Sequence, residues 1–349
     1  MKKMIKFPSI DQFRTVVTNV NRHFNFVGLD ENGEAIYDPT LPKPTLKFKG
    51  TVKLHGTNAG VSYNAKESMW AQSRENIITP EHDNAGFAFF AHTHETEFLR
   101  MFFDVAAKED IDLHKNTISI YGEWAGKGIQ KGVGISEIPK SFFIFGVKIT
   151  PHTETEEELK ENPAYWVDGS YLRNNEVKIF NIEDFPTYEM EIDFNMPQLV
   201  QNDLADLTIA VEEQCPVANH FGAVGIGEGV VWTCEFKGVV HRFKVKGEKH
   251  SSSKVKTLAS VDIEKLNSIS DFITYAVTES RFNQALENTF PNNEPIDVKK
   301  MGDLIRWVVN DVIKEESDTL AKNGLEPKDV NKYVSAAVRE MFFKLEVTR

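Results

Sequence analysis

A lysine followed by a compact polar turn is the feature of this sequence best suited to covalent chemistry. Residues 53–58 read Lys-Leu-His-Gly-Thr-Asn and directly follow a strand-like run at residues 46–52. The ε-amine of Lys53 could act as a nucleophile toward phosphorus. With five of the six letters fixed, chance alone produces such a segment in about one chain of this length in ten thousand. We therefore take Lys53 as the candidate reactive group.

A lysine nucleophile needs neighbours that favour its neutral form. An exposed lysine is almost entirely protonated at neutral pH, and nearby cations disfavour that charge while also stabilising a phosphate. Lys244 and Lys246 are the candidates, because alternation along a strand places both side chains on one face. They lie in a basic stretch, residues 237–256, that holds seven Lys or Arg and one acidic residue.

Two carboxylates stand at the ends of other strand-like runs. Glu123 follows an apolar run and could accept hydrogen bonds from ribose hydroxyls. Glu228 lies between two glycines before another strand, where it could hold a divalent metal directly or through water. Taken singly, each of these residues is more often structural than catalytic. Only their combination with Lys53 indicates a nucleotide site.

Composition narrows the class of protein. The chain has 349 residues with 41% hydrophobic content, which suffices for a full core and favours division into two domains. A net charge of -12 argues against general affinity for nucleic acids, and two Cys are too few for a disulfide framework. The first eight residues lack the apolar core of a signal peptide, and no run of about 18 apolar residues occurs. We expect a soluble cytoplasmic protein without a membrane span.

Periodicity predicts an α+β fold. A capping box at residues 9–12 is expected to open a helix to about residue 24, and a further helical stretch carries an aromatic pattern over residues 84–107. A third helix is expected at residues 197–214. Strands are expected at residues 45–53, 59–63, 68–72, 117–123, 141–149, 230–236 and 239–246. The regular helices of a doubly wound fold are missing between them, so we expect a mixed, largely antiparallel sheet.

A change in composition marks the expected domain boundary. Residues 247–254 are polar and rich in serine, which suits a connection, and helical periodicity resumes at residues 263–288, 297–314 and 327–346. We expect three parts along the chain. They are a nucleotide-binding domain at residues 1–247, a linker at residues 248–260 and a small all-helical domain at residues 261–349.

Five segments in the same order resemble motifs I, III, IIIa, IV and V of the covalent nucleotidyltransferase superfamily. They are residues 53–58, 121–123, 143–145, 228–231 and 244–246. The His-Gly-Thr-Asn form of the first is similar to the RNA ligase 2 family of phage enzymes. The resemblance spans residues 45–247 and implies an ATP-grasp-like ligase domain. Val52 and Gly146 depart from it, since relatives often carry acidic residues at both positions.

The resemblance implies an ATP-dependent RNA ligase that joins 3′-hydroxyl and 5′-phosphate ends, at nicks in duplex RNA, as in RNA repair. Lys53 would form lysyl-AMP, AMP would pass to the RNA 5′-phosphate to give RNA-adenylate, and the 3′-hydroxyl would then expel AMP. Glu228 would bind Mg²⁺ or Mn²⁺, and the enzyme would act as a monomer. The implied catalytic positions are Lys53, His55, Glu228, Lys244 and Lys246, and the implied nucleotide-binding positions are Lys53, Asn58, Arg74, Glu123, Phe145, Lys244 and Lys246.

Within this set, Glu123 would bind the ribose, Phe145 would stack on adenine, and Arg74 would contact the nucleotide or the 5′-phosphate. His55 would act near the 5′-phosphate or the metal. Three rival functions remain open: a ligase that prefers DNA or single-stranded RNA, an mRNA-capping guanylyltransferase, and a binding module without turnover. Labelled nucleotides separate the last two from a ligase. A covalent adduct with GTP favours the capping enzyme, and no adduct with either ATP or GTP favours the binding module.

Overall fold

The described part of the computed structural model comprises residues 2–38, 41–153, 155–247, 269, 272–291 and 294–347. The chain divides into two compact units. The first contains Met1–Ser73 and Ile78–Gly247, and the second contains Arg74–Ile77 and Glu248–Arg349. The linker expected at residues 248–260 lies outside the described residues, as does the start of the helix expected at 263–288.

The first unit is built on two sheets. The smaller has five strands in the order β1 (Asp11–Gln12), β14 (Val239–Lys246), β13 (Gly229–Phe236), β4 (Thr45–Lys53) and β12 (Thr187–Asp193). All neighbours in it are antiparallel except β1 and β14. Alternation along β4 sends Leu46, Phe48 and Val52 into one core, so Lys53 belongs to the opposite face.

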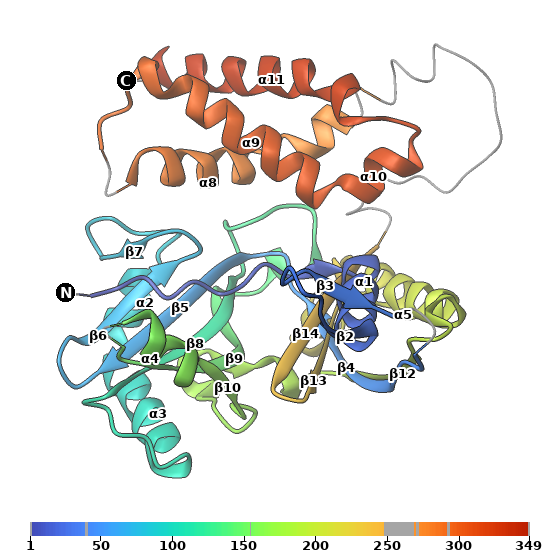
Figure 1. Cartoon of the computed structure of the whole chain (residues 1–349). Helices are drawn as coiled ribbons and strands as arrows, with labels where there is room; N and C mark the ends of the chain where they lie inside the picture. Colours follow the sequence, from blue (N-terminus) through green and yellow to red (C-terminus); the bar gives the residue numbers. More distant parts are fainter. Residues whose placement is uncertain are drawn as a thin grey trace. The chain divides into compact units, whose positions relative to one another are not determined.

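The larger sheet has seven strands (Figure 1), and the helices at residues 87–93 and 95–108 pack in a core on one face of it. The strands are β10 (Tyr165–Val167), β9 (Ser141–Pro151), β8 (Asn116–Ala125), β5 (Thr57–Asn64), β6 (Ser68–Ser73) and β7 (Ile77–Ile78) in that order, with β11 (Ile179–Asn181) parallel to β9. A separate hairpin joins β2 (Phe26–Leu29) and β3 (Ala35–Tyr37). Pairing in both sheets is mostly antiparallel, which confirms the expected fold class.

The helices of this unit are short. They are α1 (Phe13–Asn25), α2 (Phe87–Thr93), α3 (Glu95–Lys108), α4 (Glu156–Glu161), α5 (Gln201–Glu213) and α6 (Pro216–His220), with 3₁₀ turns η1 (Gly134–Glu137), η2 (Asn175–Val177), η3 (Ile182–Asp184) and η4 (Pro197–Val200).

Two local predictions about helices were wrong. The helix expected to open with a capping box at residues 9–12 begins only at Phe13, because Asp11 and Gln12 pair with β14 as β1. The aromatic helix is two helices that meet at His94, each turning its own phenylalanines into the core.

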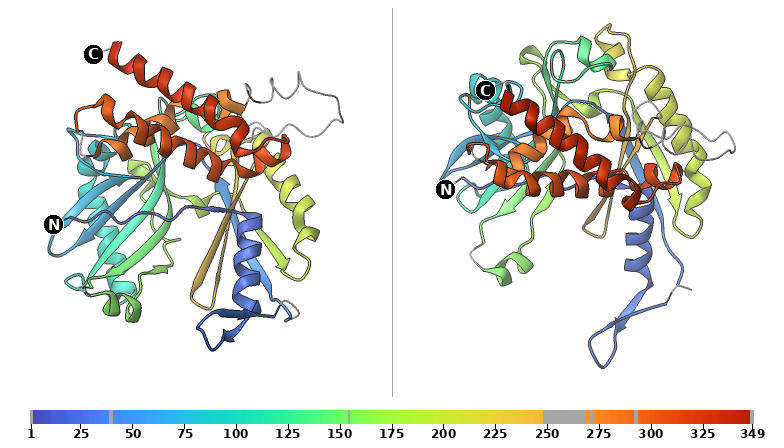
Figure 2. Two further views of the ribbon diagram at one scale, coloured as in Figure 1. Left: turned by 45° about the horizontal axis from the view of Figure 1, so that its top comes forward. Right: turned by 90° about the horizontal axis from the view of Figure 1, so that it is seen from above.

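An extended N-terminal segment, residues 2–12, connects the two sheets (Figures 1 and 2). The backbone oxygen of Ile5 accepts hydrogen bonds from Gln72 Nε2 on β6 at 2.6 Å and from the Tyr121 hydroxyl on β8 at 2.8 Å. The end of the segment is β1, which pairs with β14 at Phe243 and Lys244. The segment therefore has one anchor on each sheet.

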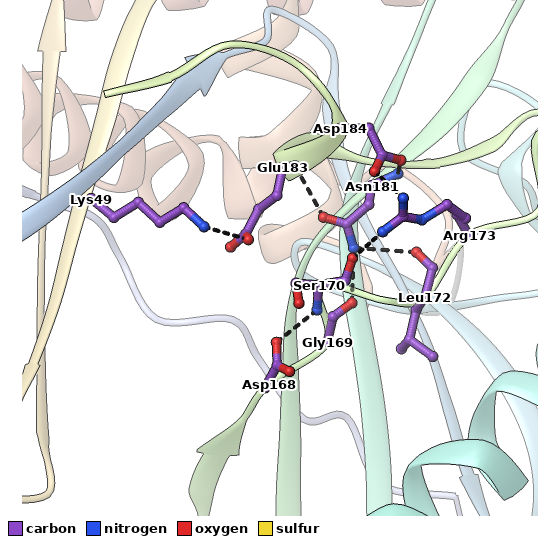
Figure 3. A network of polar contacts seen from close by, with 9 residues as sticks. All are labelled: Lys49, Asp168, Gly169, Ser170, Leu172, Arg173, Asn181, Glu183 and Asp184. Atoms are coloured by element: carbon purple, nitrogen blue, oxygen red, sulfur yellow. Dashed lines mark hydrogen bonds and ion pairs between the residues drawn. The ribbon is translucent and has the colours of Figure 1, made fainter. Parts of the chain in front are cut away.

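A polar network makes a second connection between the sheets (Figure 3). Lys49 on β4 donates to Glu183 on η3 at 2.5 Å, and the backbone N–H of Glu183 donates to Asn181 Oδ1 at 3.0 Å. The amide of Asn181, which is 2% exposed, donates in turn to the carbonyl oxygens of Gly169 and Leu172. Because every polar atom of this buried side chain has a partner, the network fixes β11 against its neighbours.

The second unit is helical over the residues that are described. Its elements are α8 (Glu279–Thr289), η6 (Val298–Lys300), α9 (Met301–Glu315), α10 (Ser317–Lys322) and α11 (Pro327–Val347). Its core contains an ion-paired arginine, since Arg281 lies 2.8 Å from Asp311 and 3.0 Å from Glu316. Among the described helices, none is both long enough and apolar enough to cross a bilayer.

Candidate active site

Three strand ends of the five-stranded sheet meet at one glycine. Gly229, the first residue of β13, lies opposite Lys53 on β4 and opposite Lys246 on β14. Gly229 has a φ of 147°, which side chains rarely allow, and an added Cβ would lie only 2.1 Å from the oxygen of Val245. Only glycine therefore fits at this position. This close approach carries the preceding residue, Glu228, to a position between the two lysines.

Glu228 is the centre of the site. Its Oε2 lies 2.6 Å from Nζ of Lys53 and 3.4 Å from Nδ1 of His55, and its Oε1 lies 3.5 Å from Nζ of Lys246. Only 4% of the Glu228 side chain is exposed. Burial alone would raise the pKa of Glu228, but the charges of Lys53 and Lys246 and the hydrogen bond with His55 hold it well below its ordinary value.

Glu123 lies beside this cluster on the larger sheet. It pairs with Asn58 across β8 and β5, and its Oε1 accepts a hydrogen bond from the backbone N–H of Gly56 at 2.9 Å. Burial raises the pKa of Glu123 to about 7; the charge of Lys53 opposes the shift, and that of Glu228 adds to it. The two carboxyl groups therefore sit close together with their pKa values pushed in opposite directions.

The turn that follows Lys53 is pressed against β8. A Cβ added to Gly56 would lie 2.4 Å from the backbone oxygen of Trp124 and 2.8 Å from Cβ of Ala125. Gln130 also holds this turn, because its Nε2 donates to the oxygen of Gly56 at 3.2 Å. Sequence reasoning missed Gln130, and its place inside the glycine-rich segment 126–132 was the available signal.

Phe145 is placed by an irregularity in the larger sheet. Tyr121 lies opposite Gly146 and Gly122 lies opposite Ile144, so Phe145 is the extra residue of a β-bulge between β8 and β9. Such a bulge re-aims a side chain. Ile144 packs in the helix-covered core, whereas Phe145 packs with Phe143 against the other core. Because Phe143 lies opposite Glu123, both phenylalanines are on the Glu123 face of the sheet.

The other two candidates, Lys244 and Arg74, are located by their strands and not by a contact with Glu228. Lys244 on β14 lies opposite Val231 on β13. It is two residues from Lys246 on the same strand and hence on the same face. Arg74 directly follows β6 in the short segment that groups with the second unit, and its Nε lies 3.8 Å from Glu75. Contacts with Glu228 thus unite Lys53, His55 and Lys246, and Glu123 interacts electrostatically with this cluster.

The donor set suits a hard divalent cation that keeps most of its waters. Mg²⁺ is commonly bound through one or two carboxylates together with water and substrate phosphate oxygens, and Glu228 with Glu123 offers that number. Within the described residues, no group of three or more His, Cys, Asp or Glu is arranged as a metal centre. A cation here would accordingly depend on oxygen atoms from outside the protein.

Known proteins show only distant similarity to this chain. Comparison with curated proteins gave no match. A solved structure of Naegleria gruberi RNA ligase with pyrophosphate is 14% identical, with a TM-score of 0.39, and the match covers 70% of this chain and 57% of that one. A mutant of that enzyme with ATP and Mn gives 12% identity, a TM-score of 0.39 and the same coverage.

These matches span little more than half of the Naegleria chain. The family described as RNA ligase matches residues 47–246, the part that contains Lys53, Glu123, Glu228 and Lys246. The matched residues are more than half of the 349 in the chain. The chain therefore belongs to the RNA ligase family.

Proposed function

We propose that this protein is an ATP-dependent RNA ligase that joins a 3′-hydroxyl to a 5′-phosphate and so forms a phosphodiester bond. The observation that carries the proposal is the convergence of Lys53, Lys246 and Glu228, with Glu123 beside them. A nucleophilic amine, a second cation for a phosphate and two carboxylates are the groups that adenylyl transfer requires. We assign this chemistry to residues 1–247 and engagement of the RNA duplex to residues 261–349.

In the first step Nζ of Lys53 attacks the α-phosphorus of ATP. The new bond joins nitrogen to phosphorus, and the amine, which attacks in its neutral form, gives one proton to solvent. The bond from the α-phosphorus to the oxygen bridging it to the β-phosphate breaks, and pyrophosphate leaves with that electron pair. Lys246 and Lys244 lie on one face of β14 and are assigned to the α-phosphate, Asn58 and Arg74 to other parts of the nucleotide. Positioning and charge neutralisation dominate such transfers.

The ion pair between Lys53 and Glu228 gives the cycle a resting form. While Lys53 donates to Glu228 at 2.6 Å, its nitrogen is engaged with a carboxylate and not with phosphorus. Attack requires Glu228 to release the amine and accept another partner. We assign Mg²⁺ or Mn²⁺ to Glu228; when bound, the ion supplies charge stabilisation to the phosphate oxygens.

Two further transfers complete the cycle. The RNA 5′-phosphate oxygen attacks the phosphorus of lysyl-AMP, and the nitrogen–phosphorus bond breaks. The nitrogen of Lys53 takes up a proton from solvent and becomes an amine again as RNA-adenylate forms. The 3′-hydroxyl then attacks the phosphorus of the RNA 5′-phosphate and loses its proton to solvent. The bond from that phosphorus to the oxygen bridging it to AMP breaks, and AMP leaves. His55, within 3.4 Å of Glu228, is assigned to hold the 5′-phosphate or the water shell of the ion. Glu123 is assigned to the ribose and Phe145 to the adenine.

Labelled nucleotide tests the first step directly. Incubation with α-labelled ATP and Mg²⁺ should label the wild-type protein, and Lys53→Met should remove the label. Lys47→Met is the matched control, since Lys47 lies on the same strand and face in an exposed pair with Glu189. A labelled Lys53→Met protein would refute the assignment of the nucleophile, and labelling by GTP instead of ATP would indicate a capping enzyme.

Substrate choice needs a second experiment. We propose a nick in duplex RNA as the substrate, sealed by a monomer in the cytoplasm. Nicked RNA duplex, nicked DNA duplex and single-stranded RNA, each with a 5′-phosphate, should be compared by gel at equal concentration. Sealing should be fastest for the RNA nick. Equal or faster sealing of the all-DNA nick would contradict the RNA assignment, even if lysyl-AMP forms.

A further inference from the structure

Phe7, in the N-terminal segment, sits at the centre of a cluster of side chains from four strands. Its ring lies 5.3 Å from Tyr121 on β8, 5.0 Å from Phe145 on β9 and 5.4 Å from Trp166 on β10. All three contacts are edge-to-face, with interplanar angles between 62° and 73°. Edge-to-face aromatic pairs have a preferred geometry, so Phe7 constrains the orientation of each ring it meets.

The backbone on both sides of Phe7 is fixed. Two residues earlier, Ile5 is held by reciprocal hydrogen bonds with the side chain of Gln72 and by the hydroxyl of Tyr121. Four residues later, Asp11 begins the parallel pairing with β14. A cation closes the cluster, because the guanidinium of Arg242 lies 4.0 Å from the Trp166 ring and 5.3 Å from that of Phe7. Phe7 is thus an anchored side chain within a fixed frame.

Phe145 needs such support. It is the extra residue of the β-bulge, so no partner residue on β8 lies opposite it. The ring is half-buried, so part of it is accessible to solvent. At the adjacent Gly146, an added Cβ would lie 3.1 Å from Trp166 and 3.8 Å from Phe7. The aromatic cluster therefore fills the space that a side chain at position 146 would occupy.

We propose that Phe7 is a positioning residue of the nucleoside site: it holds the ring of Phe145 in the orientation that stacks on the base of ATP. The N-terminal segment is then part of the nucleotide site, although it precedes the first ligase motif by more than 40 residues. The inference rests on the proposed function, because it takes Phe145 as the residue that meets the base. It adds a residue that acts through Phe145 and touches no reacting atom.

The test is the concentration dependence of lysyl-AMP formation in a single turnover. Phe7→Ala should raise the ATP concentration for half-maximal rate by about three- to tenfold, the equivalent of one aromatic pair. The rate at saturating ATP should stay within about twofold of wild type, because the reacting groups are untouched. Phe7→Tyr, which keeps the ring, should restore the wild-type concentration dependence.

Phe13→Ala is the matched control for damage to the N-terminal region. Phe13 packs on the ring of Phe243 at 5.0 Å, within the core of the five-stranded sheet. Its removal should lower the melting temperature at least as much as Phe7→Ala does, without changing the half-maximal ATP concentration. Equal effects of the two variants on that concentration would overturn the proposal, since the loss would then reflect general destabilisation.

A double-mutant cycle separates positioning from an independent contact. If Phe7 acts through Phe145, Phe7→Ala should change the half-maximal ATP concentration by less than about twofold in a Phe145→Ala background. Full additivity would overturn the proposal. Wild-type protein that forms no adduct with ATP would refute the proposed function itself. An adduct in wild type with no effect of Phe7→Ala would refute only the role of Phe7.

Discussion

Lys53 and Glu228 are 175 residues apart in sequence, yet Nζ of the first donates to Oε2 of the second at 2.6 Å. The pair forms because β4 and β13 are antiparallel neighbours whose register sets Lys53 opposite Gly229. Lys246 reaches the other oxygen of the same carboxylate from β14. Three strands of one sheet therefore assemble a single charged cluster.

Neutralising Glu228 should harm both activity and stability. Glu228→Gln keeps the shape but leaves Lys53 and Lys246 without a counter-charge, so lysyl-AMP formation should fall at least about 100-fold. Unfolding free energy should drop by about 1–3 kcal/mol at pH 7, less than for a fully buried pair because both lysines are partly exposed. Labelled-ATP kinetics and denaturant unfolding measure the two effects.

The stability loss in Glu228→Gln should depend on pH in one direction. The pKa of Glu228 is depressed in the folded protein, so its charge stabilises the fold above the unfolded value of 4.5. That contribution disappears as the pH falls through the folded pKa. The difference between wild type and variant should therefore shrink below pH 4.5, and a difference that grows there would contradict the cluster.

Glu123 should show the opposite dependence in a different pH window. Its pKa is raised to about 7, so folding favours the protonated form and stability falls as the pH rises from about 4.5 to about 7. Glu123→Gln keeps an oxygen for the N–H of Gly56 and has no charge to bury. The variant should be close to wild type at pH 5 and more stable by about 1–3 kcal/mol at pH 8. A constant difference in denaturant unfolding across this range would refute the raised pKa.

Gly56→Ala should disable the turn that carries His55. The added Cβ would lie 2.4 Å from a backbone oxygen of β8, which can move only by distorting the strand. We expect destabilisation of about 2 kcal/mol or more and loss of lysyl-AMP formation. Gly302→Ala is the control, because nothing lies within 4 Å of a Cβ there. The melting temperature and the labelling of Gly302→Ala should equal those of the wild type. A Gly56→Ala protein with wild-type labelling would contradict the packing of the turn.

In the helical unit, Arg281→Met should leave two buried carboxylates without their ion-pair partner. Arg281 pairs with Asp311 and Glu316, and their side chains are at most 15% exposed. Removal of one partner from a buried ion pair costs about 3–5 kcal/mol. Arg306→Met, which breaks an exposed pair with Asp303, should cost about 0.5 kcal/mol or less. Hydrogen exchange of α9 amides reports both, and equal protection in the two variants would contradict this ranking.

Local patterns in the sequence were sufficient for most strands near the site. The strands expected at residues 45–53 and 239–246 occur as β4 and β14 with those bounds, because alternation of apolar and polar residues is a local property. The same alternation predicted that Lys244 and Lys246 share a face. The strand β12 was missed, although Tyr188, Met190 and Ile192 alternate in it, because a single edge strand gives a weak signal.

Tertiary structure alone decided which residues meet. Local motifs predicted Lys53 and Glu228 as reactive groups, but their pairing depends on the register between strands far apart in sequence. The bulge that re-aims Phe145 arises from the pairing of β8 with β9, and Asp11 and Gln12 became a strand because β14 offered a free edge. Periodicity records how a segment folds on itself, whereas contacts between segments follow from packing and hydrogen bonding across the whole unit.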